Sequence, residues 1–588
     1  MDETIDPRQL ADRLLSEDVP TGFKMTRTGL YWQPDDPEKQ RVKVSGPFNI
    51  IAETRDRHFE DWGVFLQWKD NDGHSHEWAM PKSLLSGDGA EVRARLLSGG
   101  LYVSPRAMCR QLLNSYILDT KAEARARCVN SVGWHGVAYV TSSATYGDTA
   151  GEHIILQSAA PVPRSTQDGT FEGWQKEVAS LAIGNSRLAF AMSAAFAGPL
   201  LHIALEDSFG MHFRGRSSLG KTTSLHLAAS VAGSVINTWR TTDNSAEATA
   251  AANNDGLLLL DEISQVEGRA IDAMAYMLGN GAGKNRMRKD ATNRPTATWR
   301  IVFLSTGEEG LAEKLAEVGK KLKAGQEVRL IEIPSDTGSG HGFFENLHGH
   351  TGGDSFSRHL RFVSERHRGH AMERYLKKIT SDLPALLGSI NAAKKLWLER
   401  YLPAASSGQV SRVAARFALI AAAGELASAM GILPWPDRQA ELAAETCFRA
   451  WLDKRGNVGA SEASAGVDQV RNFISLHGSS RFSAVWEANP SSWDSKPPDA
   501  GADSRTINRA GFRRKDEQGN WNYYVLPAVW TGEICRGFNG GEVAKELAAK
   551  DLLVLGKDRA AIQLKIPGLG NTRLYHVLPA ILVGDDIA

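Results

Sequence analysis

The feature that most constrains the fold of this chain is a glycine-rich stretch at residues 209–223, which reads FGMHFRGRSSLGKTT. It contains the pattern G-x-x-x-x-G-K-[ST], which is typical of a phosphate-binding loop (P-loop) between a strand and a helix. Glycines let the backbone N–H groups of such a loop point at phosphate oxygens, and the following helix presents the positive end of its dipole. We therefore expect ATP to be bound by Gly215, Arg216, Ser217, Ser218, Leu219, Gly220, Lys221, Thr222 and Thr223.

Two residues of this loop have specific predicted roles. Lys221 is expected to reach the β and γ phosphates, and the hydroxyl of Thr222 to bind Mg²⁺. Apolar residues alternate at positions 209, 211 and 213, which predicts the strand that enters the loop, and residues 224–231 predict the helix that leaves it. The alternative interpretation is a glycine- and serine-rich turn without a ligand.

A second motif lies about forty residues further on, where the apolar run 257–260 ends in Asp261 and Glu262. A continuous apolar run is typical of a strand buried on both faces of a parallel sheet, and ligands lie at the carboxyl ends of such strands. We expect Asp261 to hold Mg²⁺ and Glu262 to polarise the attacking water.

Strand and helix patterns alternate regularly between residues 206 and 335. This alternation predicts an α/β fold with a doubly wound parallel sheet. A P-loop after the first strand and the acidic pair after the third match the order of AAA+ ATPases rather than that of a kinase or a small GTPase. The five expected strands are 209–213, 235–239, 257–260, 299–304 and 328–333.

Three further positions are candidates for the catalytic site. Ser305 or Thr306, at the end of the fourth expected strand, is predicted to be a polar sensor, with a simple strand cap as the alternative. Arg329, beside the last strand, is predicted to reach the γ-phosphate of a neighbouring subunit, with a surface salt bridge as the alternative. Arg412 and Arg416 lie one helical turn apart, and either is a candidate for a lid arginine that senses nucleotide in cis.

The segment 281–294, GAGKNRMRKDATNR, is strongly basic. Glycines at one end and a proline after it predict an exposed hairpin, which would point into the central pore of a ring. A basic pore loop fits a nucleic-acid backbone that is bound without sequence recognition, and a solvated basic loop is the alternative. The predicted DNA contacts are Lys284, Arg286, Arg288 and Lys289.

The rest of the chain sets broader limits. With 588 residues, 68 basic and 68 acidic, a nucleic-acid surface must be local rather than global. The four cysteines are far apart in the sequence, and the polar N-terminus does not have the pattern of a signal peptide. The apolar stretch 188–205 predicts a buried helix rather than a membrane span. We therefore expect a cytoplasmic protein. We expect a flexible N-terminus (1–20), a β-rich domain (21–160), a helical linker (161–205), the P-loop core (206–335), a helical lid (336–458) and a winged-helix-like domain (459–588).

Five parts of the sequence carry a resemblance to a known family: the P-loop stretch, the acidic pair, NGAGKNR, FLSTGEEG and GQEVRLIEIP. Together they resemble the family known as domain of unknown function 927. Its members are AAA+ proteins of phages and mobile elements, and some are similar to self-loading replicative helicases related to MCM helicases. The resemblance implies an ATP-dependent DNA helicase or translocase that replicates a mobile element. It also implies a homo-oligomeric ring, expected to be a hexamer with single-stranded DNA in its pore, and a separate primase.

Three other functions fit parts of the sequence. An AAA+ protein remodeller needs an aromatic or hydrophobic pore loop, but Met287 is the only large apolar residue of the basic segment. A nucleotide-switch or defence ATPase would hydrolyse ATP slowly, and the intact acidic pair argues against it. A non-enzymatic DNA-binding scaffold does not explain the P-loop.

Overall fold

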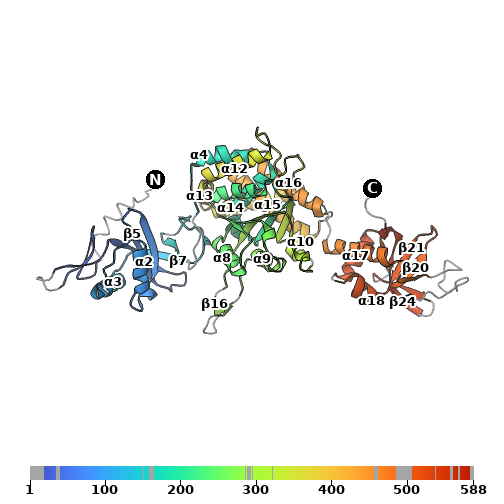
Figure 1. Cartoon of the computed structure of the whole chain (residues 1–588), viewed down its shortest axis with the longest axis horizontal. Coiled ribbons are helices and arrows are strands. Elements are labelled where there is room, and N and C mark those ends of the chain that lie inside the picture. Colours follow the sequence, from blue (N-terminus) through green and yellow to red (C-terminus); the bar gives the residue numbers. More distant parts are fainter. Residues whose placement is uncertain are drawn as a thin grey trace. The chain divides into compact units, whose positions relative to one another are not determined.

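The chain divides into two compact units, which are described separately. The first comprises Met1–Lys321, Arg329–Tyr401 and Ala415–Ala450, and the second comprises Leu322–Val328, Leu402–Ala414 and Trp451–Ala588 (Figure 1). The structure is a computed structural model that describes residues 19–34, 40–149, 151–157, 165–284, 286–287, 293–294, 296–320, 322–404, 406–455, 461–484, 506, 508–536, 538–556, 560–566 and 570–582.

The centre of the first unit is a five-stranded sheet in which every neighbouring pair of strands is parallel. The strand order is β13-β14-β17-β12-β18, so the strand that enters the P-loop lies between the fourth and fifth strands in sequence. The predicted parallel sheet is confirmed, and all seven residues of β17 are buried, as in a sheet covered on both faces. The strands are β12 (Phe209–Arg214), β13 (Ile236–Thr238), β14 (Gly256–Asp261), β17 (Ile301–Gly307) and β18 (Leu330–Pro334).

Helices cover both faces of this sheet. Helices α5 and α7 pack on each other and on β14 and β17, whereas α9 contacts β12 and has α8 and α10 beside it. Figure 1 labels α8 and α9 in the lower part of this region and α12 to α15 in its upper part. These helices are α5 (Ser186–Ala197), α7 (Lys221–Ala232), α8 (Asp243–Ala252), α9 (Gly268–Asn280) and α10 (Leu311–Ala316).

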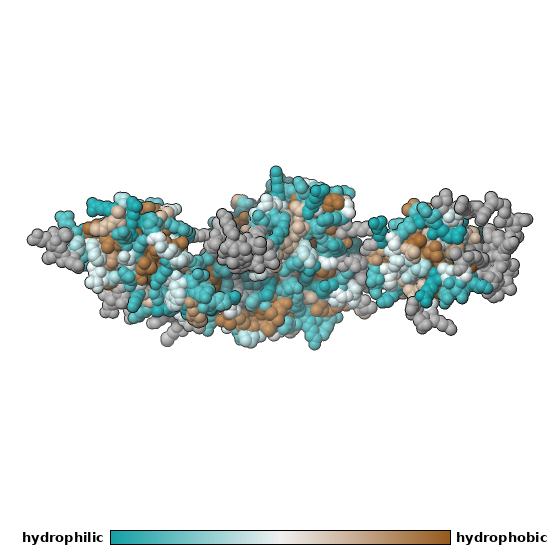
Figure 2. Space-filling view, turned by 90° about the horizontal axis from the view of Figure 1, so that it is seen from below, coloured by the Kyte–Doolittle hydropathy of each residue, from teal (hydrophilic) through white to brown (hydrophobic). Residues whose placement is uncertain are grey.

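The apolar stretch 188–205 is two helices rather than one, because the chain bends after α5 and continues as α6 (Leu200–Ile203). Every residue of α5 is buried. A Cβ atom added to Gly198 would lie 2.6 Å from the carbonyl carbon of Gly256, so glycine allows α5 to end close against the start of β14. No helix in the described part of the chain is long and apolar enough to cross a membrane, and hydrophilic residues occupy much of the face in Figure 2.

Within the expected lid region, sequence patterns predict helices at 371–379, 392–401, 410–430 and 440–452. Each of these ranges overlaps a helix of the structure, and one further helix, α12, precedes them. Sequence patterns missed α12 because its buried residues Phe356, Leu360 and Val363 lie among arginines, serines and a histidine. Helix α12 packs on α7, directly behind the P-loop. The helices are α12 (Gly353–Arg366), α13 (His370–Ile379), α14 (Leu383–Tyr401), α15 (Gly408–Ala429) and α16 (Gln439–Arg455).

The N-terminal part of the first unit is rich in strands, as expected. A three-stranded antiparallel sheet, β1-β2-β3, shares one hydrophobic core with α2, α3 and a five-stranded sheet of order β11-β7-β4-β5-β6. These elements are β1 (Phe23–Thr26), β2 (Gly29–Trp32), β3 (Val42–Ser45), β4 (Phe48–Arg55), β5 (Gly63–Lys69), β6 (Ser75–Pro81), α2 (Ala90–Ser98), α3 (Ala107–Asp119), β7 (Arg125–Val129) and β11 (His153–Leu156).

A small sheet of β8 (Gly133–His135), β9 (Ala138–Val140) and β10 (Thr145–Tyr146) joins this part to the P-loop sheet. The backbone N–H of Trp134 donates to Asp255 Oδ2 at 3.0 Å, and the hydroxyl of Tyr139 donates to the Asp255 carbonyl at 2.8 Å. Asp255 immediately precedes β14, so these bonds fix the small sheet at the amino-terminal edge of the P-loop sheet.

Sequence patterns predict a helix at 542–550 and strands around 552–557, 561–568 and 573–579, and the second unit contains a helix and strands at these places. Among the elements that sequence patterns missed are the strands β20 and β21. Arginines at successive positions hide the alternation in β20, and four large polar or aromatic residues hide it in β21. The elements are α17 (Ser461–His477), β19 (Phe482–Ala484), β20 (Gly511–Lys515), β21 (Trp521–Val525), α19 (Gly540–Ala549), β22 (Leu553–Val554), β23 (Ile562–Ile566) and β24 (Gly570–Val577).

Candidate nucleotide-binding site

Residues 215–220 connect β12 to α7 in a tight loop whose two glycines are required by space. Gly220 has φ of +100°, and a Cβ atom there would lie 2.7 Å from the ring of Phe344. A Cβ atom on Gly215 would lie 2.9 Å from Ser335 Cβ. The backbone N–H of Phe343 donates to the Leu219 carbonyl at 3.0 Å, so the segment after β18 holds the loop from one side.

Lys221 is the first residue of α7, and its side chain folds back into the loop. Its Nζ atom donates to the carbonyls of Gly215 at 2.7 Å and Arg216 at 2.6 Å. Burial lowers the pKa of this ammonium, while the carboxylates of Glu262, Glu308 and Asp261 act in the opposite direction. A partly desolvated cation surrounded by loop carbonyls is suited to exchange those carbonyls for phosphate oxygens.

Asp261 is the point where three elements of the site meet. Its Oδ1 atom accepts a hydrogen bond from Thr222 Oγ1 of α7 at 3.2 Å and another from Thr306 Oγ1 of β17. A carboxylate beside a hydroxyl, at the carboxyl ends of neighbouring strands, is a set of hard oxygen ligands of the kind that Mg²⁺ prefers. Thr222 and Asp261 were predicted as the metal ligands from separate motifs, and the fold places them in contact.

Glu262, directly after β14, has an unusual backbone conformation. Its φ is +58°, in the left-handed region that costs a residue with a side chain on the order of 1 kcal/mol. The hydroxyl of Ser264 donates to its carboxylate, and its own N–H donates to Thr306 Oγ1 at 3.3 Å. The turn therefore ties the Glu262 backbone to Thr306 and its carboxylate to Ser264.

The structure distinguishes between the two sensor candidates, Ser305 and Thr306. Thr306 faces Asp261 and Glu262, as described above. Ser305 faces the interior, where its hydroxyl accepts from Trp239 Nε1 at 2.8 Å and bonds to His212 Nδ1 at 2.8 Å. The other ring nitrogen of His212 lies 2.9 Å from the Glu309 carbonyl. Thr306 is therefore the hydroxyl at the site, and Ser305 belongs to a buried network that links β17, β12 and the residue that follows β13.

The arginine candidates occupy other places. Arg329 immediately precedes β18, with its guanidinium 4.8 Å from the Tyr276 ring centroid, so it lies at the amino-terminal edge of the sheet. The guanidinium of Arg416 lies 5.3 Å from the ring centroid of Phe209, the first residue of β12. The six residues of β12 separate Phe209 from the P-loop by about 20 Å. The prediction that Arg416 senses nucleotide in cis is therefore wrong.

Arg412 belongs to the second compact unit, and its Nε atom donates to the carbonyl of Gly408 one turn earlier in its own helix at 3.2 Å. Its role as a lid arginine stays a prediction.

The basic segment includes the predicted hairpin, formed by the antiparallel pair β15 (Arg286–Met287) and β16 (Asn293–Arg294). Before it, Lys284 Nζ forms an ion pair with Asp243 Oδ2 of α8 at 2.7 Å. This lysine is thus paired with a carboxylate of its own chain. Arg288 and Lys289 lie outside the described residues, and the side chain of Arg286 is not described.

Two residues near the P-loop were missed by sequence reasoning. Glu308, exposed just after β17, is close enough to act on the Lys221 ammonium. Arg361 of α12 donates from Nε to the hydroxyl of Thr223 at 3.3 Å. Glu308 lies within the FLSTGEEG sequence, so a second acid after the sensor strand was a visible signal, whereas nothing in the sequence connects α12 with the P-loop.

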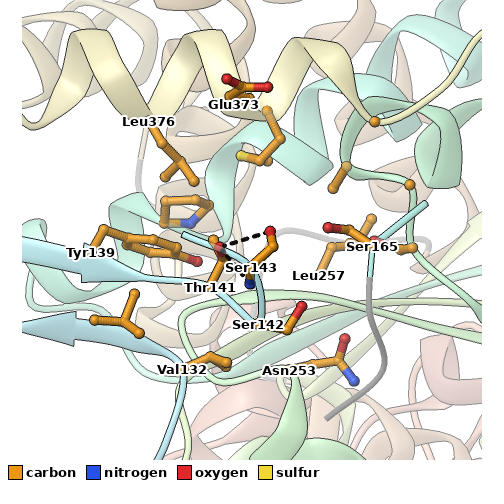
Figure 3. Close-up of a pocket in the computed structure, with 18 of the residues that line it drawn as sticks. Val132, Tyr139, Thr141, Ser142, Ser143, Ser165, Asn253, Leu257, Glu373 and Leu376 are labelled. Atoms are coloured by element: carbon orange, nitrogen blue, oxygen red, sulfur yellow. Dashed lines mark hydrogen bonds between the residues drawn. The ribbon is translucent and has the colours of Figure 1, made fainter. Parts of the chain in front are cut away.

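A cavity in the first unit lies away from this site. It has a volume of about 140 Å³ and lies at the opposite edge of the sheet, between the small sheet, the start of β14 and α13. Figure 3 shows Tyr139, Leu257 and Leu376 on its walls, with the Thr141 and Ser143 hydroxyls 3.5 Å apart. Because Leu257 is at the start of β14 and Asp261 at its end, the cavity and the P-loop are separated by the length of the strand.

The fold and this loop define a P-loop-like α/β protein. Residues 23–298 match the sequence model of a family described as "Domain of unknown function (DUF927)", in agreement with the resemblance found in the motifs. No curated protein matches the chain.

Among solved structures, the chain is similar to "SCCmec type IV Cch - active helicase", with a TM-score of 0.69 and 16% identity over 96% of this chain and 99% of that one. At this identity the likeness shows a shared fold. The apo form of the NrS-1 C-terminal region has a TM-score of 0.24 and 11% identity over 57% of this chain and 68% of that one. NtrX from Brucella abortus with ADP has a TM-score of 0.17 and 13% identity over 43% and 65%. TM-scores this low do not indicate a shared fold.

Proposed function

We propose that this chain is an AAA+ ATPase that hydrolyses ATP in a Mg²⁺-dependent reaction and uses the energy to translocate along or unwind DNA. The observation that carries the proposal is the convergence of Lys221, Thr222, Asp261 and Thr306 at one edge of a parallel sheet of order β13-β14-β17-β12-β18. Along the chain, the P-loop follows the first strand of this sheet and the acidic pair follows the third, which is the arrangement expected from the sequence for an AAA+ core.

Each residue has a role that follows from its position. The Lys221 ammonium exchanges its loop carbonyls for β and γ phosphate oxygens, and the loop N–H groups bind the same phosphates. Thr222 and Asp261 hold Mg²⁺, which when bound neutralises charge on the phosphate oxygens. Glu262 orients the water for in-line attack and accepts its proton, and Thr306 fixes Glu262 and Asp261 relative to each other.

The position of Arg329 supports a ring. At the amino-terminal edge it is separated from its own P-loop by the length of a strand, so in catalysis it serves the γ-phosphate of a neighbouring subunit. We propose a homo-oligomeric ring, a hexamer in line with the resemblance to replicative helicases, acting in the cytoplasm on a mobile element or phage with a separate primase.

DNA is proposed as the track for two reasons. The basic hairpin segment offers cations to a phosphate backbone, and the solved structure with the same fold over nearly the whole chain is described as an active helicase. The ion pair between Lys284 and Asp243 reduces the contribution of Lys284, which leaves Arg286, Arg288 and Lys289 as the proposed DNA contacts of the hairpin.

The test is the steady-state ATPase rate with and without single-stranded DNA at two salt concentrations. We expect stimulation by DNA that weakens as salt rises, because phosphate contacts release counterions. An ATPase rate that is indifferent to nucleic acid would contradict translocation on DNA and favour the protein remodeller or the nucleotide-switch ATPase. In the variant Arg286→Gln, single-stranded DNA should no longer stimulate the ATPase rate, while the rate without DNA should be unchanged.

A further inference from the structure

The three-stranded sheet β1–β3 has an outer face on which cations and aromatic rings alternate. In the strand register, Lys24 of β1 is directly opposite Tyr31 of β2, and Tyr31 is directly opposite Lys43 of β3. Residues directly opposite each other project from the same face of a sheet. Lys24, Tyr31 and Lys43 therefore form one row across the three strands.

Two further side chains extend this row. The guanidinium of Arg41 lies over the Tyr31 ring, 4.7 Å from its centroid, and the Lys43 ammonium lies 5.3 Å from the centroid of the Tyr102 ring. Tyr102 is held at the edge of the sheet because its carbonyl accepts from the N–H of Gly46 at 2.7 Å. The hydroxyl of Thr28 lies 3.1 Å from the hydroxyl of Tyr31 and fixes that ring from the β1–β2 turn.

The core determines which face is outside. Phe23, Trp32, Val42 and Val44 alternate with the residues of the row and pack into the hydrophobic core shared with α3. A one-residue shift in register would bury the charges, so the alternation fixes the cationic face toward solvent. Lys24, Arg41 and Lys43 are exposed, and half of the Tyr102 surface is accessible.

The charged residues of this face are positively charged. Segments 19–34, 40–52 and 99–118 contain no Asp or Glu, and in the described part of the chain no carboxylate forms an ion pair with a cation of the row. Acids of the β2–β3 connection, Asp35, Asp36 and Glu38, lie outside the described residues. The cations of the three segments are Lys24, Arg27, Arg41, Lys43, Arg106 and Arg110.

We propose that this outer face binds single-stranded nucleic acid, with phosphates on the cations and bases stacked on Tyr31 and Tyr102. Cations interleaved with accessible rings are what an unpaired strand requires, because its phosphates need positive charge and its bases need a flat apolar surface. The proposal stands beside the ATPase function and does not depend on it: the face lies in the N-terminal part of the chain and needs no ATP.

The experiment measures binding of a fluorescently labelled oligo-dT to the full chain by anisotropy, without nucleotide and at several salt concentrations. A Lys24→Gln/Lys43→Gln variant should bind about 5–10-fold more weakly, with the slope of log K against log salt reduced by about 1.4, since two phosphate contacts are lost. Tyr31→Leu should weaken binding about 5-fold or more and leave the slope unchanged, because it removes stacking rather than charge.

The matched control is Lys69→Gln/Lys121→Gln, which removes two exposed lysines from the same part of the chain outside the row. We expect binding within twofold of wild type for this control, and unchanged melting temperatures and DNA-independent ATPase rates for all three variants. The unchanged ATPase rate separates this surface from the nucleotide site, whose failure would appear in that rate alone. Equal losses in both lysine pairs, or no loss in Tyr31→Leu, would overturn the proposal; the latter would favour a purely anionic partner such as a lipid surface, which vesicles of anionic phospholipid would reveal.

Discussion

The two edges of the P-loop sheet are built from different kinds of residues. At the carboxyl-terminal edge, Thr222 and Thr306 both donate to the Asp261 carboxylate, and Lys221 folds into the loop beside them. At the amino-terminal edge, Arg329 and Arg416 lie against aromatic rings, beside the start of strands rather than their ends. At the first edge the side chains of Lys221, Thr222, Asp261 and Thr306 lie around one loop, whereas at the second edge Arg329 and Arg416 lie beside different aromatic rings.

This difference follows from the geometry of parallel strands. Every carboxyl end points to the same edge, so the chain places its loops and short reactive side chains together there. A cation at the other edge is a strand length away and cannot serve the same site. The comparison teaches that the candidate nucleotide site lies at the carboxyl edge alone, and it agrees with our proposal that Arg329 acts on the site of a neighbouring subunit.

The largest expected effect on the ATPase rate comes from a substitution at the carboxyl edge. Lys221→Ala should lower the ATPase rate by about 100-fold or more, because the variant lacks the cation that faces the transferred phosphate. Steady-state ATP hydrolysis measures this, with a thermal melt to establish that the variant is folded. Retention of wild-type turnover would mean that the loop does not bind the reacting phosphates.

The second prediction compares the two arginines of the amino edge. Arg329→Ala should lower the ATPase rate of the assembled protein by about 100-fold, while Arg416→Gln should leave the KM for ATP within about threefold, because Arg416 packs on Phe209 at the distant edge. The trans role is checked by mixing Arg329→Ala subunits with Glu262→Gln subunits. Recovered activity supports it, and a mixture as inactive as its components contradicts it.

The third prediction uses two adjacent hydroxyls on β17. Thr306→Val should lower kcat about 10- to 100-fold, since Asp261 and Glu262 lose their shared partner. Ser305→Ala should leave kcat within about threefold but destabilise the fold by about 1–3 kcal/mol, because the Trp239 indole N–H loses its acceptor. Rate and urea-unfolding measurements on both variants test this, and the opposite assignment of the two effects would exchange the roles of the residues.

The sequence predicted the parts of the site that local patterns encode. The P-loop, the acidic pair and the succession of strands along the chain follow from residues close together in the sequence, where glycine content and apolar runs are direct signals. The choice between Ser305 and Thr306 was not predictable, because successive side chains of β17 project from opposite faces of the sheet, and the sequence does not say which of the two lies beside Asp261. Arg416 was misplaced for a similar reason: spacing on a helix says nothing about which end of a distant sheet the helix contacts.

The smallest expected effect is on the pH dependence of stability in the second compact unit. Burial lowers the pKa of His576 to about 4, and the nearby positive charge of Arg514 acts in the same direction. The unfolded chain, with an ordinary histidine pKa near 6.5, binds more protons between these values, so stability present above pH 6.5 is lost as pH falls toward 4. Between pH 7 and pH 5, the free energy of unfolding should fall by about 1–2 kcal/mol less in His576→Gln than in the wild-type protein. Unfolding free energies measured at pH 7 and pH 5 test it, and an identical pH dependence in both proteins would contradict the buried neutral state.

The central claim is that the carboxyl edge of the sheet is a Mg²⁺-ATP site centred on Asp261. The most direct measurement is the ATP hydrolysis rate as a function of Mg²⁺ concentration in the wild-type protein and in Asp261→Asn. We predict a saturable dependence in the wild type and, in the variant, a rate lower by about 10-fold or more that needs higher Mg²⁺ to reach half its maximum. Superimposable Mg²⁺ curves with equal maxima would contradict the claim.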